Sequence, residues 1–149
     1  KNLFIWYFRQ HIIGLFETNI GDFLNYQLRL QLIITHRYRN EYVPQTIEAK
    51  VLFDADKLDS IGAVGIGRDF LFAGYFHHAL YSGNETKLAK SKKNYSYTIE
   101  DSAVLEYEFK LKKIKDKMLT KTGRAISRSR HDFMSAYFKR FWQEVKGEK

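Results

Sequence analysis

Apolar residues recur along the chain at spacings of three and four, which is the pattern of helices that bury one face. Pro44 is a typical helix-start residue, and a helix is predicted from residue 46 to 59. The apolar positions on one side of this helix are Ile47, Val51, Leu52, Ala55 and Leu58. No stretch alternates apolar and polar residues between hairpin turns, as strands would. The pattern predicts an all-α fold, a helical bundle with essentially no sheet.

The same spacing predicts helices elsewhere. Residues 1 to 17 are apolar on nearly all sides, which indicates a buried helix that contains His11. Asp22 can cap a second helix that runs to His36. Residues 70 to 80 continue as helix, whereas residues 82 to 97, with Gly83, Asn84 and several lysines, are expected to form a mobile loop.

Two more helices are expected in the C-terminal third. Thr98 and Asp101 have the spacing of a capping box, which would open a helix that reaches Met118. Gly123 would separate it from a last helix that Gly147 closes. The apolar positions predicted as core are Val104, Tyr107, Leu111, Ile114, Met118, Ile126, Phe133, Met134, Tyr137, Phe138, Phe141, Trp142 and Val145.

Three carboxylates interrupt the apolar pattern of the helix over 46 to 59. Asp54 and Asp59 fall at or inside the edges of the apolar arc, and Asp56 lies at its border, at about 100° per residue. A buried carboxylate costs several kcal/mol unless a cation or hydrogen-bond donors compensate it. The segment therefore indicates a site lined by carboxylates. The alternative is that Asp54 and Asp59 form salt bridges with buried Lys or Arg.

A glycine-spaced run follows these acids and ends at Arg68. Gly62, Gly65 and Gly67 allow close helix packing or a kink, but no strand precedes them, so they are not a dinucleotide-binding fingerprint. The Arg68 guanidinium could hold a phosphate with two hydrogen bonds. Pairing with Asp69 or with one of the nearby carboxylates is the other interpretation.

Composition narrows the class of protein. The 149 residues are enough for one domain over 1–149, and the absence of Cys excludes disulfides and thiolate chemistry. Apolar runs are too short for a membrane span, so we expect a cytoplasmic protein. Residues 1 to 86 carry a net charge of −1 and residues 87 to 149 a net charge of +9. The basic half could steer anionic substrates, bind nucleic acid, or simply be solvated.

The block from Glu48 to Asp59, with the motif Asp54-Ala55-Asp56-Lys57-Leu58-Asp59, resembles the last motif of HD-superfamily metal-dependent phosphohydrolases. The likeness continues through 61 to 68, and flanking matches are Ile33-Ile34-Thr35-His36, Pro44-Gln45-Thr46-Ile47-Glu48-Ala49-Lys50 and Lys117-Met118-Leu119-Thr120. The resemblance implies an HD-domain-like helical bundle. It also implies a divalent metal ion, Mn, Mg, Fe or Zn, held by a His, a His-Asp pair and a final Asp.

The resemblance suggests roles for six residues in and around this motif. Asp56 matches the final metal-binding Asp, with Asp54 as the fallback ligand and Asp56 and Asp59 as catalytic candidates. His36, Lys57 and Arg68 would contact a phosphorylated substrate, expected to be a nucleotide, and a homo-oligomer is compatible with this reading.

The chain departs from the family pattern upstream of Asp56. His11 and His36 are the only histidines there, and no His-Asp pair precedes the acidic block. We therefore expect either a domain that is incomplete at its N-terminus or a degenerate relative. His131-Asp132 follows the block, and its Asp lies on the polar side of a helix, so we do not interpret it as the ligand pair.

Two other classes of function remain open. The first is a catalytically degenerate HD-like domain that acts in protein association and binds no metal. The second, ranked after it, is a nucleic-acid-binding module that uses the basic C-terminal helices, whose affinity would collapse with salt.

Overall fold

The computed structural model describes residues 43–91 and 93–148, and 69% of this part is helical, with no strand among these residues. The all-α prediction is confirmed. The helices are α3 (Ile47–Asp59), α4 (Gly62–Tyr75), α5 (Glu85–Lys90), α6 (Ala103–Phe109), the 3₁₀ helix η1 (Leu111–Lys117) and α7 (Lys121–Val145). In the part described, no helix combines the length and the apolar composition needed to cross a bilayer. The predicted helices over 1 to 17 and 22 to 36, with His11 and His36, lie outside the described residues.

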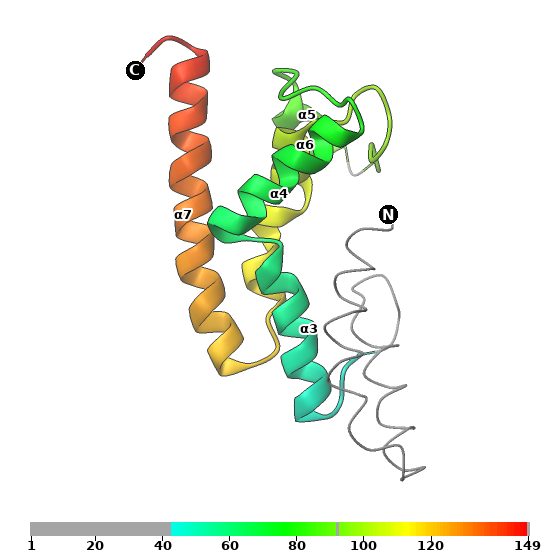
Figure 1. Cartoon of the computed structure of the whole chain (residues 1–149), viewed down its shortest axis with the longest axis vertical. Coiled ribbons are helices and arrows are strands. Elements are labelled where there is room, and N and C mark those ends of the chain that lie inside the picture. The colour runs from blue at the N-terminus through cyan, green and yellow to red at the C-terminus, as the bar shows by residue number, and fades with distance from the viewer. Residues whose placement is uncertain (1–42, 92, 149) are drawn as a thin grey trace.

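The longest helix, α7, runs along one side of the described part of the chain (Figure 1). Helices α3 and α4 follow each other along the chain and both contact α7, as does η1. The shared core contains Ile61 and Ile66, the inner faces of α6 and η1, and Met134 and Phe138 of α7. Helix α5 contacts mainly α6.

Helix α3 has the predicted bounds but buries a different face. Thr46 caps its first turn by accepting a hydrogen bond from Ala49 N at 3.2 Å. Ile47 and Val51, predicted to lie on the buried side, are 61% and 54% exposed. The residues of α3 that are buried are Ala49, Phe53, Asp54 and Lys57. The prediction was wrong because polar contacts, described below, help to decide which side of α3 faces α7.

The apolar stripe from Val104 to Met118 is core, as predicted, but it does not lie on one continuous α-helix. Helix α6 ends at Phe109, Lys110 leaves the helical region at φ −128°, and a 3₁₀ helix follows. Residues three apart eclipse each other in a 3₁₀ helix, which places Leu111 and Ile114 on the same buried side. The predicted capping box is also wrong. Ser102 caps α6 through Leu105 N, while Asp101 accepts a hydrogen bond from Tyr97 N.

The predicted loop after α4 contains a short helix. Helix α4 ends at Tyr75 rather than near residue 80, and α5 begins at Glu85, whose side chain is buried. The Glu85 carboxylate accepts hydrogen bonds from Ser82 N and from the Ser102 hydroxyl, which belongs to the cap of α6. This buried carboxylate joins the starts of α5 and α6, whereas most of the other described residues from 82 to 97 are exposed.

Gly123 lies inside the first turn of α7 instead of before the helix. Thr120 is the N-cap and accepts a hydrogen bond from Gly123 N at 2.9 Å. At the other end Gly147 has φ +70° and closes the helix, as predicted. Met134 and Phe138 are buried as expected, but four residues predicted as core are exposed: Ile126, Phe133, Tyr137 and Val145.

One carboxylate, Asp69, is buried between α4 and α6 without a compensating cation of its own. It is 9% exposed, and its Oδ2 has no hydrogen-bond partner in the described part of the chain. Burial raises the pKa of the Asp69 carboxyl from 3.8 to about 8, and the nearby Glu106 and Asp101 add to this effect, while Lys110 opposes it. The Asp69 carboxyl with this pKa is therefore mostly neutral below about pH 8.

We expect Gly123→Ala to lower the free energy of unfolding by about 1 to 3 kcal/mol, the usual range for overpacking. A Cβ at this position would lie 2.2 Å from Asp54 Oδ2, which cannot move without losing its own hydrogen bonds. Urea denaturation measures the change. The matched control is Gly67→Ala in α4, where nothing lies within 4 Å of the added Cβ. This control should be neutral or gain up to about 1 kcal/mol, and equal losses in both variants would contradict the close approach.

Asp69 should make the protein less stable as the pH rises. Between pH 3.8 and about 8 the unfolded chain has released this proton while the folded protein keeps it, so the contribution is lost progressively over that window. The slope is at most about 1.4 kcal/mol per pH unit. Asp69→Asn should flatten the slope and raise the melting temperature at pH 8. The control Asp132→Asn, at an exposed position, should change neither, and an unchanged slope in Asp69→Asn would disprove the assignment.

Candidate functional site

The three carboxylates of α3 lie in three different environments. Asp54 is 3% exposed and faces the start of α7. Its Oδ1 accepts a hydrogen bond from Leu119 N at 2.8 Å, and its Oδ2 accepts hydrogen bonds from Thr120 N at 2.8 Å and Thr120 Oγ1 at 2.6 Å. Both carboxylate oxygens are thus engaged by donors at a helix N-terminus, where a negative charge is favoured.

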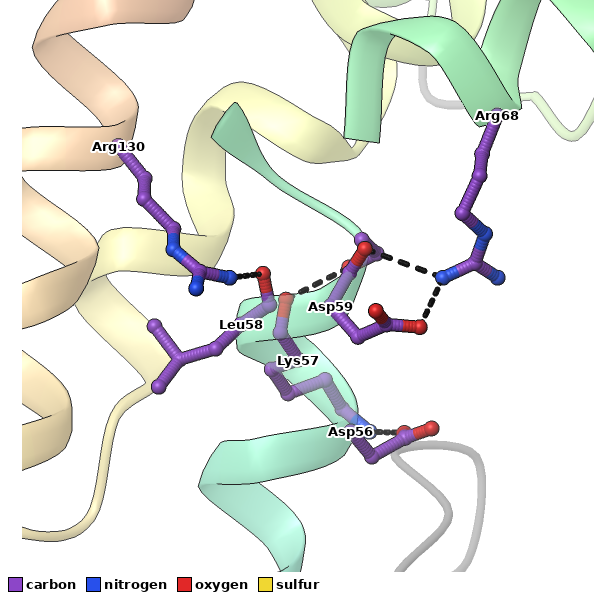
Figure 2. Close-up of polar contacts among 7 residues, drawn as sticks. Asp56, Lys57, Leu58, Asp59, Arg68 and Arg130 are labelled. Atoms are coloured by element: carbon purple, nitrogen blue, oxygen red, sulfur yellow. Dashed lines mark hydrogen bonds and ion pairs between the residues drawn. The ribbon is translucent and has the colours of Figure 1, made fainter. Parts of the chain in front are cut away.

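Asp56 pairs with its neighbour Lys57. The Lys57 Nζ lies 2.6 Å from Asp56 Oδ2 (Figure 2). It also lies 4.5 Å from the centre of the Phe53 ring. The two side chains are 18% and 10% exposed, so the pair is largely withdrawn from water. A partly buried pair of this kind is screened less by salt than a surface pair.

Asp59, at the end of α3, pairs with Arg68 of α4. Arg68 Nη1 donates to the Asp59 carboxylate and also to the Asp59 backbone oxygen at 3.0 Å (Figure 2). The two side chains are 50% and 38% exposed, so the pair contributes little to stability. Of the carboxylate pairings considered for Arg68, the structure shows the one with Asp59, a carboxylate of the acidic block.

A fourth contact reaches α3 from α7. Arg130 Nη1 donates a hydrogen bond to the backbone oxygen of Leu58, in the last turn of α3 (Figure 2). The aliphatic part of Arg130 packs against Gly62, where an added Cβ would lie 3.0 to 3.2 Å from the Arg130 side chain. Gly62 has φ +82°, so this position combines a turn that favours glycine with a close approach.

The carboxylates of α3 therefore do not converge on one point. Among residues 43–91 and 93–148, no group of three or more His, Asp and Glu side chains could hold a metal ion. Asp54 and Asp59 each have their own partners. One oxygen of the Asp56 carboxylate binds Lys57. The other oxygen has no hydrogen-bond partner among residues 43–91 and 93–148, so Asp56 can offer one oxygen ligand to a metal ion.

The His-Asp dipeptide after the acidic block lies on α7, away from these contacts. Asp132 is exposed, as predicted, and His131 is half-buried with its Nε2 3.3 Å from Ser135 Oγ. Burial and the nearby Lys115 hold the pKa of His131 below its ordinary value of 6.5. A second histidine, His78, lies 3.4 Å from Asp101. Neither pair adds a ligand to the acidic block.

Two contributors to the site were missed by the sequence analysis. The backbone of 119–120, with the Thr120 hydroxyl, supplies all the donors to Asp54, and Arg130 binds the end of α3. A signal for the first existed, because Thr120 precedes a helical pattern as an N-cap does. None existed for Arg130, since its partner is a backbone oxygen 72 residues away.

Comparison with known proteins gives a consistent picture of the fold. No family model matches the chain. The chain is 38% identical to YpgQ of Bacillus subtilis over an aligned stretch of 104 residues. This stretch covers 70% of this chain and 43% of YpgQ. The chain thus spans less than half the length of this relative.

Solved structures extend the likeness. The crystal structure of Bacillus subtilis YpgQ in complex with ADP has a TM-score of 0.54 at 38% identity, over 68% of this chain and 45% of that one. An HD-superfamily hydrolase from Bacillus thuringiensis has a TM-score of 0.54 at 29% identity, over 68% of this chain and 47% of that one. The Lin1889 protein from Listeria innocua shares the fold, with a TM-score of 0.68 over 92% of this chain at 24% identity. The helical arrangement is therefore similar to that of an HD-superfamily hydrolase.

Proposed function

We propose that this chain is part of a metal-dependent phosphohydrolase of the HD type that acts on a nucleotide or a related phosphate compound. The observation that carries the proposal is the similarity, in sequence and in fold, to an HD-superfamily hydrolase over 68% of the chain. The crystallisation of the related YpgQ with ADP supports a nucleotide as the class of substrate. A cytoplasmic location and a single domain belong to the same proposal.

Asp56 is the residue of α3 that fits a metal ligand. Asp54 fits poorly, because both of its oxygens already accept hydrogen bonds from 119–120 and a metal ion would have to replace them. We therefore propose Asp56 as the ligand and a structural role for Asp54. The remaining ligands would come from outside the described residues, where His36 lies. Mn, Mg, Fe and Zn all accept such oxygen and imidazole ligands.

A bound divalent ion would supply a water of lowered pKa and polarise a phosphoryl oxygen. The chain's own residues would bind and orient the substrate. Lys57 is a largely buried cation beside Asp56. Because the dielectric constant is low there, its attraction to the negative charge of a phosphate would be stronger than at the surface. Arg68 is more exposed, so its guanidinium can exchange Asp59 for a phosphate. His36 completes the proposed substrate contacts, and Asp59 would hold Arg68 in place between turnovers.

The test compares Asp56 with Asp132 in the natural full-length protein. Asp56→Asn keeps an oxygen acceptor for Lys57 but loses the ligand charge, so we expect divalent-metal content and phosphohydrolase activity to be lost. Changes in the outer shell of metal sites already cost about 10- to 100-fold, and removal of a ligand should cost more. Asp132→Asn, at an exposed position on α7, should leave both unchanged. Metal analysis by mass spectrometry and nucleotide hydrolysis are the two measurements.

Two results would contradict the proposal. One is a wild-type protein that binds no divalent metal and hydrolyses no phosphate ester or anhydride, which would favour the degenerate association domain. The other is loss of metal in Asp132→Asn rather than in Asp56→Asn. Salt-sensitive binding to nucleic acid without hydrolysis would support the basic module instead.

A further inference from the structure

Helix α7 holds α3 at two points that lie on either side of Asp56. The first is the Asp54 carboxylate, which binds the backbone at 119–120 and the Thr120 hydroxyl. The second is the Leu58 backbone oxygen, which accepts a hydrogen bond from Arg130 (Figure 2). The segment between the two points is one turn of helix, and it carries the Asp56–Lys57 pair.

Two points of attachment constrain α3 more than one does. Thr120 and Arg130 are separated along α7 by about 15 Å, at 1.5 Å per residue. Asp54 and Leu58, four residues apart, lie about one turn apart on α3. A single contact would let α3 rotate about its own axis or slide along α7. With both contacts in place, rotation would break one of them, so the direction in which Asp56 projects is set.

The Arg130 side chain packs against one residue and donates a hydrogen bond to another. Its methylene groups fill the space beside Gly62 so closely that a Cβ there would lie 3.0 Å away. Its guanidinium binds a carbonyl in the last turn of α3, where the helix dipole favours a positive charge. The side chain is therefore fixed at both ends, which allows it to transmit the position of α7 to the end of α3.

We infer that Arg130 is a positioning residue for Asp56, acting through the Leu58 backbone. This inference rests on the proposed function, because it gives Asp56 a role for which its direction matters. It also assigns Asp54 to the same task at the other end of the turn. Arg130 itself touches neither substrate nor metal in this assignment.

The test replaces the donor and keeps the packing. Arg130→Met retains a long unbranched side chain against Gly62 but cannot donate to Leu58. In the natural full-length protein, we expect Mn²⁺ to bind about tenfold more weakly and kcat at saturating Mn²⁺ to fall about tenfold, as for other outer-shell changes. KM for the nucleotide should change less than about twofold. Arg130→Lys, which restores a donor, should recover most of both losses.

A second measurement does not depend on activity. Amide hydrogen exchange of the metal-free protein should be faster in the peptide over 54 to 60 in Arg130→Met, relative to a reference peptide in the middle of α7. The matched control is Arg128→Met, an exposed arginine on the same helix. Its metal binding, kinetics and exchange should equal those of the wild type.

The outcomes separate the two proposals. If the wild type binds Mn²⁺ and hydrolyses nucleotides but Arg130→Met changes only the melting temperature, the positioning role is wrong and the function stands. If the wild type neither binds Mn²⁺ nor hydrolyses nucleotides while hydrogen exchange over 54 to 60 still rises in Arg130→Met, the proposed function is wrong. Arg130 then only holds the end of α3 in place. Unchanged exchange in Arg130→Met overturns the inference whatever the activity.

Discussion

The structure depends most on the hydrogen bonds between one buried carboxylate and the start of one helix. Asp54 is 3% exposed and would be costly in this position without compensation. The N-terminus of α7 supplies what it needs, because the first N–H groups of a helix have no partners within the helix. The Asp54 carboxylate and the backbone N–H groups at the start of α7 therefore supply each other's hydrogen-bond partners. This contact turns α3 so that Asp54 and Phe53, rather than Ile47 and Val51, face the rest of the fold.

The sequence allowed the class of the fold to be predicted, because spacing of apolar residues is a local property. The core stripe from Val104 to Met118 followed from this spacing. The start of α3 and the closure of α7 at Gly147 followed from helix-start and helix-end residues, which are also local signals. Spacing failed where a second element decides the outcome. The burial of Glu85 and the close approach of Asp54 to Gly123 both depend on neighbours distant in the sequence.

The sequence analysis identified the residues of the candidate site but did not predict how they contact one another. The acidic block was recognisable from its motif, and the alternative that one of its acids pairs with an arginine is realised by Asp59 and Arg68. Spacing placed the three carboxylates near one arc of the helix, which suggested a shared cavity. Each has a separate partner instead: Asp56 pairs with Lys57, Asp59 with Arg68, and Asp54 with the residues at the start of α7. No pattern within α3 contains that information.

The residues that join α3 to α7 are far apart in the sequence, and this separation affects folding during synthesis. The bonds from Asp54 close loops of 65 and 66 residues, and that from Arg130 closes a loop of 72 residues. Contacts between residues this far apart slow folding, since the loop must be ordered before the contact stabilises it. A ribosome adds about 5 to 20 residues per second, so α3 emerges several seconds before its partner. During that interval the acidic helix has no fixed orientation, and a nascent chain that stops before α7 would expose it to chaperones and proteases.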